Sequence, residues 1–226
     1  HGDHTGDSQF YGHIDVRFHA DIITDAQEAD EKFNEVYSHS HAELGMRLED
    51  NITLNANIKL EGESSGHNHG GGGSAADGND RFFEDHPLLV GGLTLNYDDD
   101  NFSAYVGKFN PVVGFNYHNF PGIYGYSQIE EYAIRERVGL GGTIKHTAGD
   151  NGTHKFNFST FYADTSILSD SLNHRRGRTR YESGGVANTE DLSSYAVSLS
   201  GSDFYSLTNN FIEGLSYRLG YAMQAK

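Results

Sequence analysis

Histidine pairs at alternate positions are the first residues in this chain that could bind a metal ion. His39 and His41 stand two residues apart, and His67 and His69 repeat that spacing inside a glycine-rich stretch. Imidazole binds zinc and copper, and the chain has no cysteine, so a zinc site here would use histidine and carboxylate ligands. The alternative is that these histidines belong to polar loops and take up zinc or copper only adventitiously.

A second group of candidate residues mixes acids and bases near the middle of the chain. Ser127 and Glu130 have the spacing of a capping box, in which each side chain bonds a backbone N–H of the first helical turn. Glu131 and Arg135 follow at a favourable four-residue spacing. Together these residues predict a short helix at about 128–136.

A third group is purely basic. Arg175, Arg176, Arg178 and Arg180 form a cluster in an otherwise acidic chain. Guanidinium groups bind phosphates and carboxylates through paired hydrogen bonds, so this cluster could contact lipopolysaccharide, a neighbouring subunit or an anionic solute. The alternative is local pairing with the acidic residues that follow it in the chain.

Further charged residues alternate with apolar ones, which assigns them to strands with two different faces. The polar face contains Asp15, Arg17, His19, Asp21, His39, His41, Glu43, Arg47, Lys59 and Arg218. The apolar face contains Ile14, Val16, Phe18, Leu44, Leu48, Leu54 and Ile58. The first set is therefore expected to face water and the second to face lipid.

The elements that position these residues are predicted to be nine strands. The clearest alternation covers 11–21, 38–48 and 52–60. Weaker patterns predict further strands at 88–97, 102–109, 137–146, 154–164, 193–203 and 211–222.

The connections between these strands alternate in length. Long ones are predicted near 24–36, 61–87, 110–136 and 165–192, and each is followed by a shorter one. Such alternation puts every long loop at one edge, which is typical of an outer-membrane up-and-down barrel. The predicted strands also match the ~9–11 tilted residues that cross a bilayer.

Composition narrows the function classes. The chain has 226 residues and a formal net charge of −16, which argues against a nucleic-acid-binding protein. No apolar run approaches the ~20 residues of a spanning helix. We expect a single all-β domain over 1–226, an antiparallel transmembrane β-barrel.

Closure of this barrel raises a question of strand number. Bacterial single-chain barrels have even strand counts, whereas nine strands are predicted here. At roughly 25 residues per strand, a barrel of about 16 strands needs about 400 residues, so we expect the N-terminal strands of a larger barrel. The alternative is a complete eight-stranded barrel. The first methionine is Met46, so any signal peptide is expected to have been removed already.

The segment Val106–Gly114, with sequence VGKFNPVVG, carries a family resemblance. It resembles a Gly-Lys-Phe-x-Pro-x-x-Gly stretch of Gram-negative outer-membrane porins, including relatives of phosphate-selective porins. That resemblance implies that the loop 110–136 folds into the barrel and narrows the pore. The implied constriction residues are Glu130, Glu131, Arg135, Glu136 and Arg137. It also implies contacts with the lipid bilayer and lipopolysaccharide, and a homotrimer.

The function expected from these observations is passive diffusion of small hydrophilic solutes or ions through a water-filled pore in the outer membrane of a Gram-negative bacterium. No catalytic motif and no cofactor are expected, with calcium at the acidic loops left open. The alternatives are a zinc- or copper-binding uptake barrel and a structural or adhesive barrel. The acidic excess of the proposed constriction predicts weak cation preference, whereas the arginines at 175–180 would favour anions if their loop folded inward.

Overall fold

The protein is an all-β chain, described by a computed structural model over residues 9–27, 32–61, 79–83, 86–114, 133–173, 176–204 and 215–226. Its strands are β1 (Gln9–Asp15), β2 (Phe18–Ile22), β3 (Asn34–Glu49), β4 (Ile52–Glu61), β5 (Arg81–Phe82), β6 (Leu88–Asp98), β7 (Phe102–Phe109), β8 (Arg137–Thr147), β9 (Thr153–Ala163), β10 (Ser194–Ser202) and β11 (Tyr217–Met223). Short 3-10 turns cover Gly149–Asn151, Ile167–Ser169 and Tyr181–Ser183.

All these strands belong to one sheet of 11 strands, whose main path runs β1-β3-β4-β6-β7-β8-β9-β10-β11. Neighbours on this path are antiparallel and follow one another in the chain. β2 continues the line of β1 along β3, and β5 pairs with β3 in parallel. The antiparallel, up-and-down strand order predicted from the sequence is confirmed.

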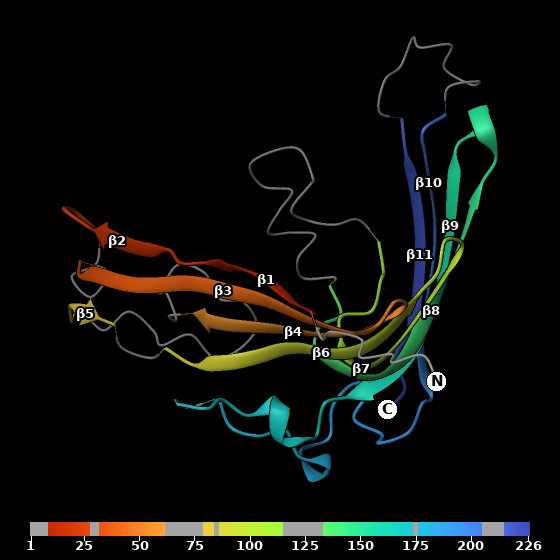
Figure 1. The fold of residues 1–226 in the computed structure, drawn as a ribbon. Helices are drawn as coiled ribbons and strands as arrows, with labels where there is room; N and C mark the ends of the chain where they lie inside the picture. Colours follow the sequence, from red (N-terminus) through yellow and green to blue (C-terminus); the bar gives the residue numbers. More distant parts are fainter. Residues whose placement is uncertain are drawn as a thin grey trace, which may run out of the picture.

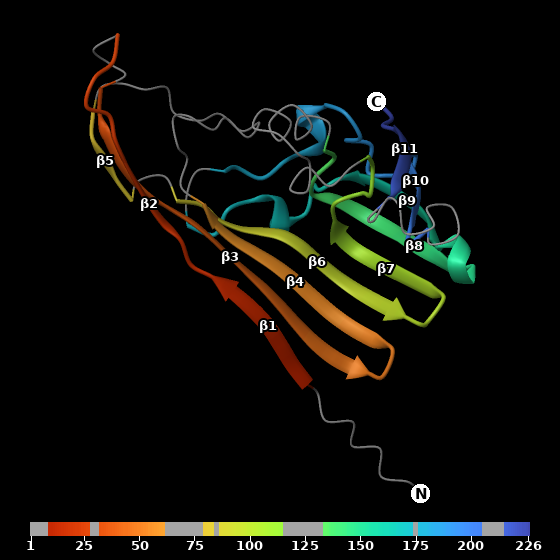
Figure 2. The same cartoon turned by 90° about the horizontal axis from the view of Figure 1, so that it is seen from above.

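The sheet is strongly curved, and β10 and β11 stand at a steep angle to β1 and β3 (Figures 1 and 2). The described strands do not close into a barrel, since the path ends at β1 on one side and at β11 on the other. The short connections between β3 and β4, β6 and β7, and β8 and β9 lie at one edge, whereas the long connections leave the other.

The outer, convex face of the sheet is apolar. Cross-strand pairing aligns Leu95 with Val106 and Val106 with Leu140, and all three side chains are exposed. Other exposed apolar side chains on this face are Phe10, Ile14, Leu44, Leu48, Ile144, Phe156, Phe158, Leu199, Leu219 and Tyr221. An exposed apolar surface of this width is typical of a face that contacts a membrane or another protein.

A small hydrophobic core lies on the concave face instead. Phe109, Ile134, Phe161, Ala187 and Ala196 are buried together there. Phe161 and Ala196 come from β9 and β10, whereas Ile134 and Ala187 come from the long connections. The core therefore fastens the ends of two loops against the inner side of the sheet.

Two predictions about local structure were wrong. The first predicted strand is broken between β1 and β2, where the Ser40 hydroxyl accepts the backbone N–H of Arg17 at 3.1 Å. The predicted helix at 128–136 is absent over its described residues, 133–136. Glu136 has a φ of 52° and its N–H donates to the Asn110 side chain, which is incompatible with a continuing helix. Residues 128–132 lie outside the described part.

Candidate functional site

The concave face of β1, β3 and β4 carries rows of polar side chains that run across the strands. Tyr11 donates a hydrogen bond to Asn55 Oδ1 at 2.8 Å, and its ring lies over Gly45 between them. A Cβ at position 45 would collide with that ring, so a glycine is needed there. The next rows are His13–Glu43–Asn57 and Asp15–His41–Lys59.

Charged and aromatic groups on this part of the face have local partners. Asp15 forms an ion pair of 2.6 Å with Arg17. Asp21 accepts a hydrogen bond from the Tyr37 hydroxyl at 3.1 Å, and the His19 ring stacks on Tyr37 with centroids 5.0 Å apart. These contacts fix the positions of the acidic and aromatic side chains on the concave side.

A cavity of about 790 Å³ lies on the concave face between β1, β3, β4, β6 and β7. Glu43, Lys59 and Asn57 line it from the strands, and Arg135 lines it from the end of the loop 110–136. Its volume falls within the range of sites for small molecules. The mixture of charged and amide groups makes it a polar, water-accessible space.

The loop that follows β7 turns onto the concave face. Arg218 on β11 donates to the Gly114 carbonyl at 3.3 Å, and a Cβ at Gly220 would come within 2.6 Å of the Gly114 nitrogen. β8, β9 and β10 separate β7 from β11 in the sheet, so 110–114 crosses the concave side. Residues 110–114 of this loop therefore lie over the concave face, and 115–132 lie outside the described residues. That the loop narrows a pore stays a prediction.

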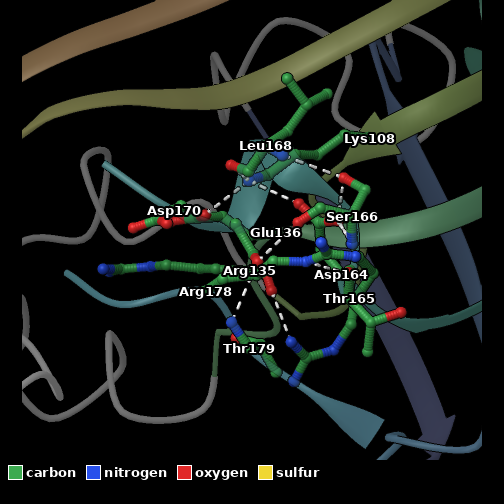
Figure 3. Close-up of polar contacts among 12 residues, drawn as sticks. Lys108, Arg135, Glu136, Asp164, Thr165, Ser166, Leu168, Asp170, Arg178 and Thr179 are labelled. Carbon is green, nitrogen blue, oxygen red and sulfur yellow. Dashed lines mark hydrogen bonds and ion pairs between the residues drawn. The ribbon is translucent and has the colours of Figure 1, made fainter. Parts of the chain in front are cut away.

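A cluster of ion pairs holds both long loops where they leave the sheet (Figure 3). Lys108 Nζ lies 2.9 Å from Glu136 and 2.8 Å from Asp164, and it donates to the Leu168 carbonyl at 2.7 Å. Arg176 completes the cluster with two hydrogen bonds to Glu136, of 2.8 and 2.6 Å. Two cations thus face two carboxylates, and the side chains of Lys108 and Asp164 are 1% and 2% exposed.

Gly107 explains how Lys108 reaches this cluster. Strict alternation would put Lys108 on the convex face with Val106. Gly107 has a φ of 135°, and a Cβ there would collide with the Leu93 carbonyl oxygen. The changed chain direction at this glycine allows the lysine side chain to join the buried carboxylates.

The electrostatic environment favours an ionised Glu136. Burial raises the pKa of its carboxyl, but the hydrogen bonds and charges of Arg176 and Lys108 outweigh burial, so the pKa lies below the usual value of 4.5. Because the folded pKa is depressed, this group stabilises the folded chain at neutral pH, and that contribution is lost as pH falls below about 4.5.

The loop 165–192 is fixed along the edge of the sheet by further contacts. Asp164 accepts hydrogen bonds from the Ser166 backbone and hydroxyl, at 2.9 and 2.6 Å. Leu172 donates to the Leu88 carbonyl at 3.0 Å, and Asn173 accepts from the Leu88 N–H at 2.6 Å. The first part of this loop therefore crosses from β9 to the start of β6.

The predicted constriction residues that the structure describes lie in different places. Arg135 lines the cavity, whereas Glu136 lies in the ion-pair cluster. Arg137, the first residue of β8, donates to the Arg135 carbonyl and to the Gln224 side chain. Glu130 and Glu131 lie outside the described residues.

The predicted lumen residues within strands share one face of the sheet. The pairing register and strand alternation put Asp15, His19, Asp21, Glu43, Arg47, Lys59 and Arg218 on the concave side. Arg17 lies between β1 and β2 and pairs with Asp15. That this face lines a pore stays a prediction.

The histidines do not form a metal site in the described part of the chain. The ring centroids of His41 and His13 lie 6.4 Å apart, and those of His39 and His19 lie 6.2 Å apart. Over the described ranges no group of three or more His, Asp or Glu side chains is arranged to hold a metal ion. His67 and His69 lie outside those ranges.

Several residues of this face were missed in the sequence analysis. Lys108 stands in an apolar strand, its partners Glu136 and Asp164 are 28 and 56 residues away, and Arg176 joins through Glu136, so no local pattern identifies the cluster. Of the arginine group, Arg176 pairs with Glu136 and Arg178 donates to the Thr165 carbonyl at 2.9 Å, whereas Arg175 is not described.

No family model, curated protein or solved structure matches this chain. In the residues that the structure describes, no helix is long and apolar enough to cross a membrane.

Proposed function

We propose that the sheet is part of the wall of a transmembrane β-barrel in the outer membrane, and that the barrel is a passive porin for small hydrophilic solutes or ions. The observation that carries the proposal is the division of the curved sheet into a continuous apolar convex face and a polar, charged concave face. A barrel wall needs this division because one side contacts lipid and the other water.

Two features of the sheet favour contact between its convex face and lipid. Arg or Lys on a lipid-facing surface would cost about 2–4 kcal/mol at mid-depth, and the convex face carries Leu95, Val106 and Leu140 instead. β6, β8 and β9 each have 11 residues, close to the ~9–11 that cross a bilayer when tilted.

Aromatic residues near the short connections add to this support. Tyr97 and Phe102 flank the turn between β6 and β7, with ring centroids 6.4 Å apart. Phe204 stacks on Tyr217 at 5.8 Å, and the Tyr217 hydroxyl shares a hydrogen bond with His154. Amphipathic rings at this level are typical of the girdles at the membrane interface.

The free edges of β1 and β11 must be paired in such a membrane protein. An unpaired backbone N–H or C=O in hydrocarbon costs several kcal/mol, so only a closed sheet is stable there. The proposal therefore requires further strands between these two edges.

Passage through this pore needs no chemical step. A solute would move along the concave face, past the cavity between β1 and β7 and past the segment 110–114 that crosses to β11. The ion-pair cluster joins the end of the loop 110–136 to the start of the loop 165–192. The cation preference inferred above is not part of the proposal, because Glu136 is neutralised by Lys108 and Arg176.

Single-channel recording in a planar bilayer tests this function. The purified protein should produce stable conductance steps in KCl, and the Leu95→Arg variant, which puts a charge on the convex face, should insert far less often. Thr94→Arg is the matched control because the neighbouring side chain lies on the concave face, and it should still insert. A bilayer that stays silent with well-folded wild-type protein that includes the strands between β1 and β11 would contradict the porin proposal.

A further inference from the structure

The strands β8, β9, β10 and β11 carry basic residues without any acidic residue. No Asp or Glu occurs in Arg137–Thr147, Thr153–Ala163, Ser194–Ser202 or Tyr217–Met223. This is unusual in a chain whose formal net charge is −16. These four neighbouring strands therefore form a basic section of an acidic protein.

Three of the bases lie in a single row across these strands. Lys145 on β8 pairs directly with Lys155 on β9, Lys155 pairs with Ser200 on β10, and Ser200 pairs with Arg218 on β11. We call this set, Lys145, Lys155, Ser200 and Arg218, the basic row. Adjacent strands are about 4.8 Å apart, so the row presents three cations and one hydroxyl within a short arc.

The basic row belongs to the concave face. Asn157, two residues from Lys155, donates to the Thr143 hydroxyl and lies within 3.4 Å of the Tyr105 hydroxyl, beside the concave core. Side chains two residues apart on a strand share a face, so Lys145 and Lys155 point the same way as Thr143 and Asn157. Arg218 contacts Gly114, which crosses the same side.

A row of like charges needs a compensating group. Like charges directly opposite each other on antiparallel strands destabilise a sheet. Lys108, by contrast, lies within 3 Å of two carboxylates. Among the described residues no carboxylate forms an ion pair with Lys145 or Lys155, and both side chains are exposed to solvent.

We propose that the basic row binds a small divalent oxyanion, and so selects dianions among the solutes that use the pore. Two ammonium groups on facing strands match the two charges of a sulfate or a short dicarboxylate. The Ser200 hydroxyl and the Arg218 fork supply donors with fixed directions. The inference rests on the porin proposal for its role in transport, but the binding site itself does not require a pore.

Titration calorimetry in detergent at low salt tests binding directly. Sulfate and succinate are the probes, and acetate is the monovalent comparison. The wild-type protein should bind a dianion about tenfold or more tightly than acetate, because two charge-assisted contacts replace one. Binding of sulfate alone would assign an inorganic oxyanion, and binding of succinate as well would assign dicarboxylates.

Matched double variants separate the basic row from the general charge of the concave face. Lys145→Gln with Lys155→Gln should weaken dianion binding about tenfold or more. Arg47→Gln with Lys59→Gln removes the same charge from the same face on β3 and β4, and it should leave binding within about twofold. Equal weakening in both variants, or wild-type binding no tighter than acetate, would overturn the proposed site.

Bilayer recording distinguishes this result from the porin proposal. Sulfate added to a KCl solution should reduce the chloride current of the wild type but not of the Lys145→Gln, Lys155→Gln variant. Channels that conduct but ignore sulfate in both proteins would overturn the proposed dianion selection while the porin function stands. Dianion binding in a protein that forms no channels would overturn the porin function and leave the site.

Discussion

The two ends of the curved sheet carry the same alternation of polar and apolar residues, but the charged residues are mixed at one end and only basic at the other. The strands β1, β2, β3 and β4 combine several carboxylates with Arg47, Lys59 and a set of histidines. The strands β8, β9, β10 and β11 have bases and hydroxyl groups and no carboxylate. The fold requires only that the concave face be polar. The sign of the charge on that face can therefore differ between the two ends according to function.

The two ends also differ in how their charges are compensated. On the β1 side, Asp15 and Arg17 pair locally, and Asp21 accepts a hydrogen bond from Tyr37. On the β9 side, Lys145 and Lys155 face each other without a described ion partner. Between these ends lies the neutral cluster of Lys108, Glu136, Asp164 and Arg176. The cluster in the middle of the sheet is electrically neutral, whereas Lys145 and Lys155 have no described counter-charge. We infer that folding does not require the excess positive charge at that end.

The largest effect is expected from breaking the cluster between the two ends. Lys108→Met leaves the Asp164 carboxylate, 2% exposed, without its cation. Removing one partner of a buried ion pair typically costs about 3–5 kcal/mol. Denaturant unfolding in detergent should show this loss, and Lys59→Met, on the polar cavity, should cost far less. Equal losses would mean that the cluster is not a main fastening of the loops.

A smaller loss of stability is expected from a charge on the convex face, which both ends of the sheet share. Leu95→Arg should destabilise the protein in lipid by about 2–4 kcal/mol, since the side chain is 43% exposed on the convex face. The neighbouring substitution Thr94→Arg should be tolerated. Unfolding measured in lipid vesicles checks the difference, and an equal cost for the two arginines would argue against a lipid-facing convex surface.

Charge reversal should have opposite signs at the two ends. Lys155→Glu converts a like-charge pair with Lys145 into an ion pair and should stabilise the sheet by roughly 0.2–1 kcal/mol. Lys59→Glu adds a carboxylate to the cavity that Glu43 already lines and should destabilise it. Denaturation midpoints at low salt check both, and the same sign for the two changes would remove the contrast between the ends.

The smallest expected effect is a local response to acid. The pKa of Glu136 is depressed by Arg176 and Lys108, so the cluster is stable at neutral pH and loosens as pH falls below about 4.5. Hydrogen exchange of residues 176–192 should rise between pH 6 and pH 3.5 after correction for the intrinsic rate. In Glu136→Gln, exchange should already be faster at pH 6 and change less with pH.

Strand positions were predicted well because alternation is a local property of the sequence. Each of the nine predicted strands overlaps a strand of the sheet, and β4 and β7 agree within a residue at each end. The break at Arg17 was missed because it depends on the Ser40 hydroxyl of a neighbouring strand. The short β5 was also missed because two residues carry no periodicity.

The candidate site was predicted less completely, because contacts between distant residues decide it. The spacing of Ser127, Glu130 and Arg135 predicted a helix, but Glu136 has a left-handed backbone conformation and its side chain pairs with Lys108 and Arg176. One feature of the sequence does predict the pairing of Lys145 with Lys155. Lys145 and Lys155 stand five residues before and five residues after Asp150, which lies between Gly149 and Gly152, so a hairpin centred there brings them together.

The most direct test of the central claim is the environment of alternate residues along one strand. The chain has no cysteine, so single cysteines can carry a fluorescent label without background. Labels at Leu54, Ala56 and Ile58 on β4 should be quenched by brominated lipid, and labels at Thr53, Asn55 and Asn57 by iodide in the water. Equal quenching by both agents at neighbouring positions would contradict a sheet with one face in lipid and the other in a pore.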